Sequence, residues 1–363
     1  MIRTVVGLAV LAVMLAACSL GVPPGASTPP STAASSAPAE SAEVIPSGSA
    51  EVSEPTPLAA QSWEGHAAED LAIVRLLDEQ DPTTQVFIFE ADGNLRQVTG
   101  LSNALGASYP VWSPDGSQLA FNDAKGGSGP FGQVGIVNAD GSDERSYGEG
   151  RDHQWSPDGT QIVYQESDPI GEGETSMFLL DVASGQVTDI GLGALPRWLP
   201  DGERISFLRT VELDAGALTS ALHVMPVAGG EAELIAEETI AYWSPDGTSV
   251  LLEHDGVITL ADADFGNQRE IARGFSPVWA PDSQSFVVAY DHDADANPVL
   301  AYLDLDGRAR WSGVSGVGPT WSPDGTRLGV EIYAPEFPLV RVIEAATGGV
   351  VWEEQGMQPA WRP

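Results

Sequence analysis

An all-β fold built from repeated four-stranded units is predicted by three observations. A Trp-Ser-Pro-Asp-Gly motif, or a close variant, recurs along most of the chain. The mean spacing between Trp112 and Trp361 is about 41.5 residues, in the range of one four-stranded propeller blade. Short β-rich runs follow each motif and are separated by turns that contain glycine. Together these features predict a single β-propeller, a ring of blades around a central channel.

The motif has a mechanical explanation. In Ser-Pro-Asp-Gly, proline presets the backbone of the second turn position, and serine and glycine suit the first and fourth positions. The motif therefore predicts a tight turn between two antiparallel strands, with the tryptophan ending the first of them. We assign a structural role to the repeat tryptophans, which are Trp112, Trp155, Trp198, Trp243, Trp279, Trp321 and Trp361.

Each blade is predicted to contain strands A to D in chain order. Strand A ends in the tryptophan, and strand B is the β-rich run behind the turn, for example residues 119–121 and 162–164. Strand C is a third run, such as residues 134–137, and a shorter strand D leads to the next tryptophan. Because strands alternate in direction, the A–B and C–D turns share one face of the ring. The longer B–C loops, at 123–133, 166–175, 210–220 and 291–298, share the other face, where function usually lies.

The number of blades depends on how the two ends of the repeat region combine. Residues 71–100 supply runs like strands B, C and D without the tryptophan motif in front of them, and residues 358–361 supply a strand A. The two pieces complete one blade. Six internal blades and this composite one make seven, closed by the C-terminal strand, which leaves no open strand edge. An alternative register uses Trp63 as the first strand A.

This pattern resembles the TolB-type β-propeller repeat, a relative of the WD repeat, over about 300 residues and six motif copies. The resemblance implies a disc of blades that serves as a recognition scaffold. TolB proteins also carry an α/β domain before the propeller. Here a low-complexity segment stands in that place, so the pattern departs from the family.

Residues 1–17 have the features of a secretory signal peptide. Arg3 precedes an apolar run from Val5 to Ala17, which is too short to span a bilayer as a helix. The segment Leu15-Ala16-Ala17-Cys18 resembles the bacterial lipobox, whose cysteine is acylated, and Cys18 is the only cysteine of the chain. We therefore expect a lipid anchor at Cys18 on the extracytoplasmic side of a membrane. The alternative is an ordinary signal peptide with a chance cysteine.

The segment of residues 18–61 is predicted to be a disordered tether. Serine, proline and alanine dominate it, and it contains no aromatic residue. Such a composition buries too little apolar surface to offset chain entropy. The domain organisation is thus a signal peptide at 1–17, a lipidated tether at 18–61 and a propeller at 62–363.

The charge of the protein excludes two kinds of partner. The chain has 52 acidic against 16 basic residues, a formal net charge of −36. Nucleic acid binding needs a basic stripe, and docking on anionic lipids needs a polybasic patch. We therefore expect no nucleic acid partner and membrane contact through the lipid anchor only.

Positive charge is scarce, so its position is informative. Lys125 is the only lysine. Arg151, His153 and Arg197 lie one to four residues before a repeat tryptophan, in neighbouring blades. This spacing predicts a basic spot at the channel mouth, on the face of the long loops, that could hold an anionic group. The alternative is that these side chains pair with neighbouring carboxylates.

Two acidic patterns could bind a cation. Asp291, Asp293, Asp295 and Asn297 carry oxygen ligands at alternate positions, like the first half of a calcium loop, although Ala296 replaces the usual glycine. The alternative is a solvated acidic loop. The aspartates of the turn motifs form the second pattern, and local hydrogen bonds within each turn explain why every copy has one.

Catalytic motifs are missing from the sequence. The five histidines form no His-Glu-x-x-His motif, and no Gly-x-Ser-x-Gly elbow occurs. We expect no enzyme activity and no cofactor apart from the calcium alternative. The predicted function is a non-catalytic binding or assembly scaffold for an unidentified protein or glycan of the cell envelope. The alternatives are a component of a TolB-like envelope complex and a secreted hydrolase or lactonase that uses channel carboxylates.

Overall fold

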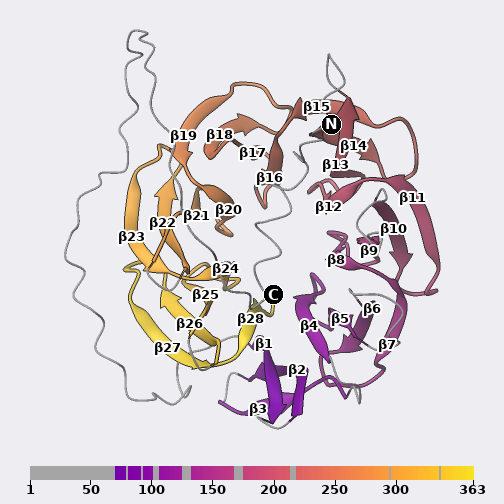
Figure 1. Ribbon diagram of the computed structural model, residues 1–363, viewed down its shortest axis with the longest axis vertical. Helices are drawn as coiled ribbons and strands as arrows, with labels where there is room; N and C mark the ends of the chain where they lie inside the picture. Colours follow the sequence, from indigo (N-terminus) through magenta and orange to yellow (C-terminus); the bar gives the residue numbers. More distant parts are fainter. Residues whose placement is uncertain are drawn as a thin grey trace, which may run out of the picture.

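A computed structural model describes residues 70–78, 81–90, 93–100, 106–124, 132–166, 175–212, 218–293, 296–334 and 337–363. They form seven four-stranded antiparallel sheets in a ring (Figure 1), which confirms the predicted seven-bladed β-propeller. The predicted signal peptide, the tether with Cys18, and Trp63 lie outside these residues. No helix in the described part of the chain is long and apolar enough to cross a bilayer.

The strands of each blade run outward from the axis in the order A to D. Blade I contains β28 (Met357–Trp361), β1 (Leu71–Asp78), β2 (Asp81–Phe89) and β3 (Leu95–Gln97). Blade II contains β4 (Ala107–Trp112), β5 (Gln118–Asp123), β6 (Gln133–Asn138) and β7 (Arg145–Glu149). Blade III contains β8 (Arg151–Trp155), β9 (Gln161–Glu166), β10 (Ser176–Asp181) and β11 (Val187–Leu192).

The remaining four blades continue the ring in chain order. Blade IV contains β12 (Ala194–Trp198), β13 (Arg204–Glu212), β14 (Leu218–Pro226) and β15 (Glu233–Glu237). Blade V contains β16 (Ile240–Trp243), β17 (Ser249–His254), β18 (Val257–Asp262) and β19 (Arg269–Arg273). Blade VI contains β20 (Phe275–Trp279), β21 (Ser285–His292), β22 (Pro298–Asp304) and β23 (Ala309–Ser315). Blade VII contains β24 (Val317–Trp321), β25 (Arg327–Ile332), β26 (Leu339–Glu344) and β27 (Val350–Gln355).

One predicted loop is mostly strand. Residues 210–220 were expected to form a long B–C loop, but β13 extends to Glu212 and β14 begins at Leu218, paired from Glu212↔Leu218 inward. The β-branched residues Thr210, Val211 and Thr219 suit the extended ladder, so the hairpin continues beyond the blade core.

The composite blade closes the ring as predicted. Strand β28 pairs antiparallel with β1, with Trp361 opposite Leu71 and Met357 opposite Val74. The Arg362 side chain adds two ties, donating to Asp70 Oδ2 and to the Gly116 carbonyl, both at 2.8 Å. Strand A of blade I therefore contains Trp361.

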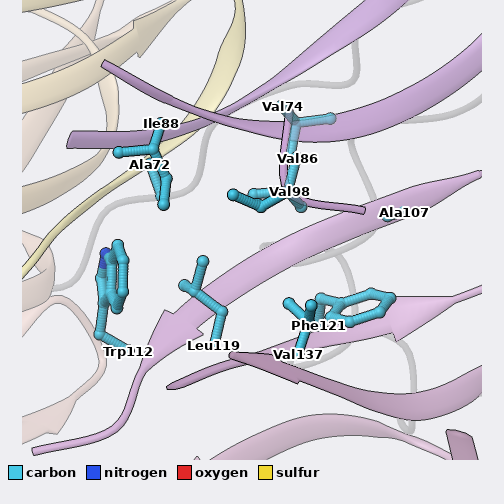
Figure 2. Packing of buried hydrophobic residues seen from close by; sticks show 10 residues of the cluster. All are labelled: Ala72, Val74, Val86, Ile88, Val98, Ala107, Trp112, Leu119, Phe121 and Val137. Atoms are coloured by element: carbon cyan, nitrogen blue, oxygen red, sulfur yellow. The ribbon is translucent and has the colours of Figure 1, made fainter. Parts of the chain in front are cut away.

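The core lies between neighbouring blades. Figure 2 shows one such interface, in which apolar side chains of blade I face those of blade II. The alternation of side chains along each strand gives every sheet two apolar faces, and each packs against the next blade. The residues drawn are Ala72, Val74, Val86, Ile88 and Val98 from blade I, and Ala107, Trp112, Leu119, Phe121 and Val137 from blade II.

Four of the repeat tryptophans connect strand A of one blade to strand A of the blade before it. The indole N–H of Trp155 donates to the carbonyl of Val111, at 3.0 Å, and that of Trp279 to the carbonyl of Tyr242, at 2.8 Å. Trp112 and Trp198 donate in the same way. In each pair the acceptor is the residue just before the preceding tryptophan. Each of these bonds thus satisfies the indole N–H of a repeat tryptophan.

The turn aspartates are engaged within their own turns. Asp115 Oδ1 accepts hydrogen bonds from Ser113 Oγ, at 2.7 Å, and from the backbone N and Oγ of Ser117, at 2.9 and 2.8 Å. These bonds, with the one from Ser113 the strongest, lower the pKa of Asp115 to about 2. Gly116 closes the turn at a positive φ of 67°. The same serine–aspartate bond recurs at Asp158, Asp246 and Asp324.

Candidate functional site

Strand A contains a second repeated feature that the sequence analysis missed. In six blades the residue three positions before the tryptophan has a left-handed backbone, and the ladder to strand B shifts register there. Blade V has no such bulge in its ladder. A proline two residues before five of the tryptophans is the signal that could have shown it. The left-handed residues are Tyr109 (φ 52°), Asp152 (55°), Leu195 (52°), Ser276 (50°), Gly318 (55°) and Gln358 (50°).

Polar side chains of the preceding blade hold several of these bulges. Gln165 Oε1 accepts from the backbone N of Leu195, at 2.5 Å, and Glu253 Oε2 accepts from that of Ser276, at 2.9 Å. Glu331 Oε2 accepts from the backbone N of Gln358, at 3.0 Å. We call these three contacts the bulge latches. They offset the cost of a left-handed non-glycine residue, about 1–3 kcal/mol.

The residues just before the tryptophans form what we call the inner wall of the ring. They lie on the innermost strands, and every one keeps some solvent exposure. Val111 is 36% exposed and the nearby Tyr109 is 48% exposed, so water reaches this surface. The inner wall consists of Val111, Gln154, Arg197, Tyr242, Val278, Thr320 and Ala360.

Arg197 is the cationic member of the inner wall. When the Gln154 amide is turned so that its oxygen faces Arg197, the Nε and Nη1 of Arg197 donate to Gln154 Oε1 at 3.3 and 3.1 Å. Arg197 Nη1 also donates to the carbonyl of the preceding residue, Pro196, at 3.3 Å. No carboxylate of the described residues lies within 4.0 Å of it. Burial lowers the pKa of Arg197, and the nearby charge of Asp152 opposes this, so the guanidinium remains charged.

Tyr242 and Glu253 form a hydrogen-bonded pair beside Arg197. The Tyr242 hydroxyl donates to Glu253 Oε2 at 3.0 Å. Burial is the main cause that raises the pKa of both groups, and the Glu253 charge adds to the effect on Tyr242. The pair therefore supplies a polar, partly desolvated surface next to the arginine.

The other two residues of the predicted basic spot are arranged differently. Arg151 pairs with Asp152, Nε to Oδ2 at 3.5 Å, so its charge is compensated, as in the alternative interpretation. His153 is 4% exposed and packs between blades, with its Nε2 3.0 Å from the Tyr109 carbonyl. Burial lowers the pKa of His153 to about 4, which leaves the ring neutral at pH 7. His153 therefore adds no positive charge to the site, which sequence position alone could not reveal.

The predicted calcium loop uses its oxygen atoms for local bonds. Asp293 Oδ1 accepts from the backbone N of Asn297, at 2.9 Å, and Asn297 Oδ1 accepts from that of Tyr333, at 2.7 Å. Asp291 Oδ1 accepts from the N of His292, at 2.8 Å. Asp295, like Lys125, lies outside the described residues. Within them, no three acidic, histidine or cysteine side chains gather in a way that could hold a metal. Calcium at this loop stays a prediction.

Comparisons with known proteins relate the chain to others by fold. No protein-family model and no curated protein matches it. An oligogalacturonate lyase in complex with manganese is 15% identical, with a TM-score of 0.55 over 77% of this chain and 83% of that one. A protein assigned as a 6-phosphogluconolactonase from Bacteroides uniformis is 15% identical, with a TM-score of 0.53 over 80% and 97%. TolB from Acinetobacter baumannii is 18% identical, with a TM-score of 0.48 over 81% and 67%.

Similarity at these identities shows the fold alone. The ring of blades, the tryptophan bonds and the turn motif define the class: a seven-bladed β-propeller. The inner wall, with Arg197, is the candidate binding surface of the propeller.

Proposed function

We propose that this protein is a lipid-anchored, extracytoplasmic binding scaffold whose inner wall receives an anionic group of a cell-envelope protein or glycan. The observation that carries the proposal is Arg197, a half-buried arginine without an ion-pair partner among the described residues. A charged side chain that is withdrawn from water is normally paired. Arg197 therefore has unused capacity for a carboxylate or phosphate.

The electrostatic setting supports selectivity rather than general anion binding. The protein carries a net charge of −36, so its surface repels most anions at a distance. Only a group that reaches the inner wall meets Arg197 and the Tyr242 hydroxyl. A partner that presents an anion on a narrow projection, such as a peptide carboxylate or a uronic acid, fits this arrangement.

Binding is tested by comparing three proteins in a pull-down from solubilised membranes and in a thermal-shift assay with glucuronate and with phosphate. Arg197→Ala is expected to lose the captured partner or the thermal shift. Arg209→Ala is the matched control, because that guanidinium already bonds to the Leu192 carbonyl at 2.9 Å. Equal binding by wild type and Arg197→Ala, with unchanged melting, would refute the anion site.

The anchor is tested separately, by fractionation. Cys18→Ser is expected to move the protein from the membrane fraction to the soluble extracytoplasmic fraction, because the acyl chains are lost. Membrane retention of the Cys18→Ser variant would contradict the lipid anchor without affecting the proposal for Arg197. Recovery of one stable multiprotein assembly with the wild type would favour the TolB-like complex over a simple receptor.

A second candidate function rests on Glu253. Burial raises the pKa of this carboxyl, which is a property of general acids, and it lies beside a tyrosine hydroxyl. A hydrolase or lactonase would therefore use Glu253 as its proton donor. Turnover on a panel of lactones that disappears in Glu253→Gln would support this candidate. A complete lack of turnover by the wild type would leave the binding scaffold as the function.

A further inference from the structure

A cavity of about 230 Å³ lies at the seam where blade VII meets blade I. Its apolar walls come from Val74, Leu76, Leu77, Phe337, Pro338 and Met357. Leu77 is 43% exposed, so an apolar side chain remains in contact with water at this site.

The cavity lies beyond the end of the ladder that closes the ring. The last pairing between β28 and β1 joins Met357 to Val74, whereas β1 continues to Asp78. The residues of β1 beyond Val74 therefore have no partner in β28. Two polar side chains, Arg75 and Gln355, and Gly356 complete the lining of the cavity.

Arg75 has an equivalent in blade IV that shows what is unusual about it. Arg209 follows Leu208, the residue that pairs with the start of β12, just as Arg75 follows Val74. Arg209 has firm contacts: it donates to the Leu192 carbonyl from Nε and Nη2, at 3.1 and 2.9 Å, and lies 5.0 Å from the centre of the Phe207 ring.

Arg75 has weaker contacts than its equivalent. Within the described residues its ion pair joins Nη2 to Glu354 Oε1 at 3.8 Å, which is too long for a good hydrogen bond. The Glu354 side chain is 40% exposed, so the pair is screened and worth under about 1 kcal/mol. The Arg75 guanidinium thus has donors to offer at the edge of an apolar cavity.

We infer that this seam cavity binds a small amphipathic anion. The apolar chain of the anion would lie against the apolar walls, which include Val74 and Met357, and its carboxylate would bind Arg75. At about 30 Å³ for each small heavy-atom group, the volume holds roughly eight such groups. The eight carbons of octanoate match this volume, and its two carboxylate oxygens would lie at the edge of the cavity on Arg75. This site is separate from the inner wall and does not depend on the function proposed for Arg197.

The test is calorimetric titration of the full propeller with octanoate, and with octan-1-ol as the uncharged match. Saturable octanoate binding is expected, at least tenfold tighter than that of octan-1-ol. Arg75→Ala should weaken octanoate at least tenfold and leave octan-1-ol unchanged. Arg209→Ala and Arg197→Ala, which leave the cavity intact, should bind octanoate like the wild type.

A second variant keeps the inference falsifiable if Arg75→Ala disturbs the seam. Leu77→Asp changes an exposed side chain, so folding is retained, and its carboxylate should repel octanoate. Absence of saturable octanoate binding by the wild type would overturn the inference. Equal affinity for octanoate and octan-1-ol, or unchanged binding by both Arg75→Ala and Leu77→Asp, would overturn it as well.

Discussion

The turns that follow the tryptophans and the inner wall that precedes them are built from the same repeat, yet they differ in uniformity. In the turns, the serine–aspartate hydrogen bond recurs in blade after blade with nearly the same length, 2.7 Å at Asp115, Asp158 and Asp246. On the inner wall, the residue before the tryptophan is valine in one blade, arginine in another and tyrosine in a third. The residues that repeat in the turns therefore hold the ring together. The inner-wall residues, which differ from blade to blade, are free to bind a partner.

Blades IV and V show this departure most clearly. Blade V lacks the bulge that its neighbours have, and its strand A places Tyr242 against Glu253. Blade IV supplies Arg197 next to that pair. The uniform region should respond to mutation through stability, whereas the variable region should respond mainly through binding. The following experiments separate these two responses.

The largest effect is expected from removing the strand that closes the ring. Deletion of Met357–Pro363 exposes the β1 edge and the surface that Trp361 covers. An open strand edge promotes aggregation. We expect loss of the monomer peak in size-exclusion chromatography. Arg362→Ala, which removes the ties to Asp70 and Gly116 and the contact with the Trp112 ring but keeps the strand, should stay monomeric. A truncated protein that remains monomeric and melts normally would contradict closure by β28.

The next effect in size comes from a repeat tryptophan. Trp155→Ala should lower the free energy of unfolding by about 3–5 kcal/mol, because a large buried side chain is lost. Trp155→Phe keeps most of the packing but leaves the Val111 carbonyl without its indole donor, and should cost about 1 kcal/mol. Urea denaturation measures both values. If the two variants were equally unstable, the hydrogen bond rather than the packing would dominate the role of the tryptophan.

A smaller effect is expected from a turn aspartate, and it depends on pH. Asp115→Ala removes three acceptor contacts in an exposed turn and should cost about 1 kcal/mol at pH 7. Because the pKa of Asp115 is lowered to about 2, its stabilisation is present above the ordinary range near 4 and is lost as the pH falls through 2.

Melting curves from pH 7 to pH 2 test this dependence. The difference between wild type and Asp115→Ala should shrink as the pH falls below about 4. Glu203→Ala, which changes an exposed acid in the equivalent turn of blade IV, serves as the control and should show no such difference. A constant difference at every pH would mean that the turn does not depend on the aspartate charge.

The smallest effect is expected from a bulge latch. Burial raises the pKa of Glu253, so its charged form is a cost to stability. That cost appears as the pH rises above the ordinary pKa of the unfolded chain and is fully present above the raised pKa. Glu253→Gln keeps an oxygen that can accept from the Ser276 N–H, as Gln165 does for Leu195 in blade III. We expect a Tm about 2 °C higher at pH 7.5 and no change at pH 4. A lower Tm at pH 7.5 would show that the latch requires the charge.

The distance over which each feature acts explains what could be predicted from the sequence. The Ser-Pro-Asp-Gly turn is closed by bonds within five residues, so its residue types predict its shape. The constant period then predicts the blades, and the two incomplete pieces at residues 71–100 and 358–361 predict the closing strand. Arg197 was identified as a candidate for the same reason, by its distance from Trp198.

The remaining features depend on which blades meet and in what register. His153 could be identified as near the axis from its sequence position, but only its burial between neighbouring blades lowers its pKa and makes it neutral. The bond to the Tyr109 carbonyl, 44 residues away, acts in the opposite direction. The bulge latches and the seam cavity likewise join residues from different blades. Sequence determined the repeat unit and the closure of the ring, because both follow from local turn chemistry and spacing. Tertiary structure alone decided which arginine keeps unused donors, because pairing depends on contacts between strands that are distant in the chain.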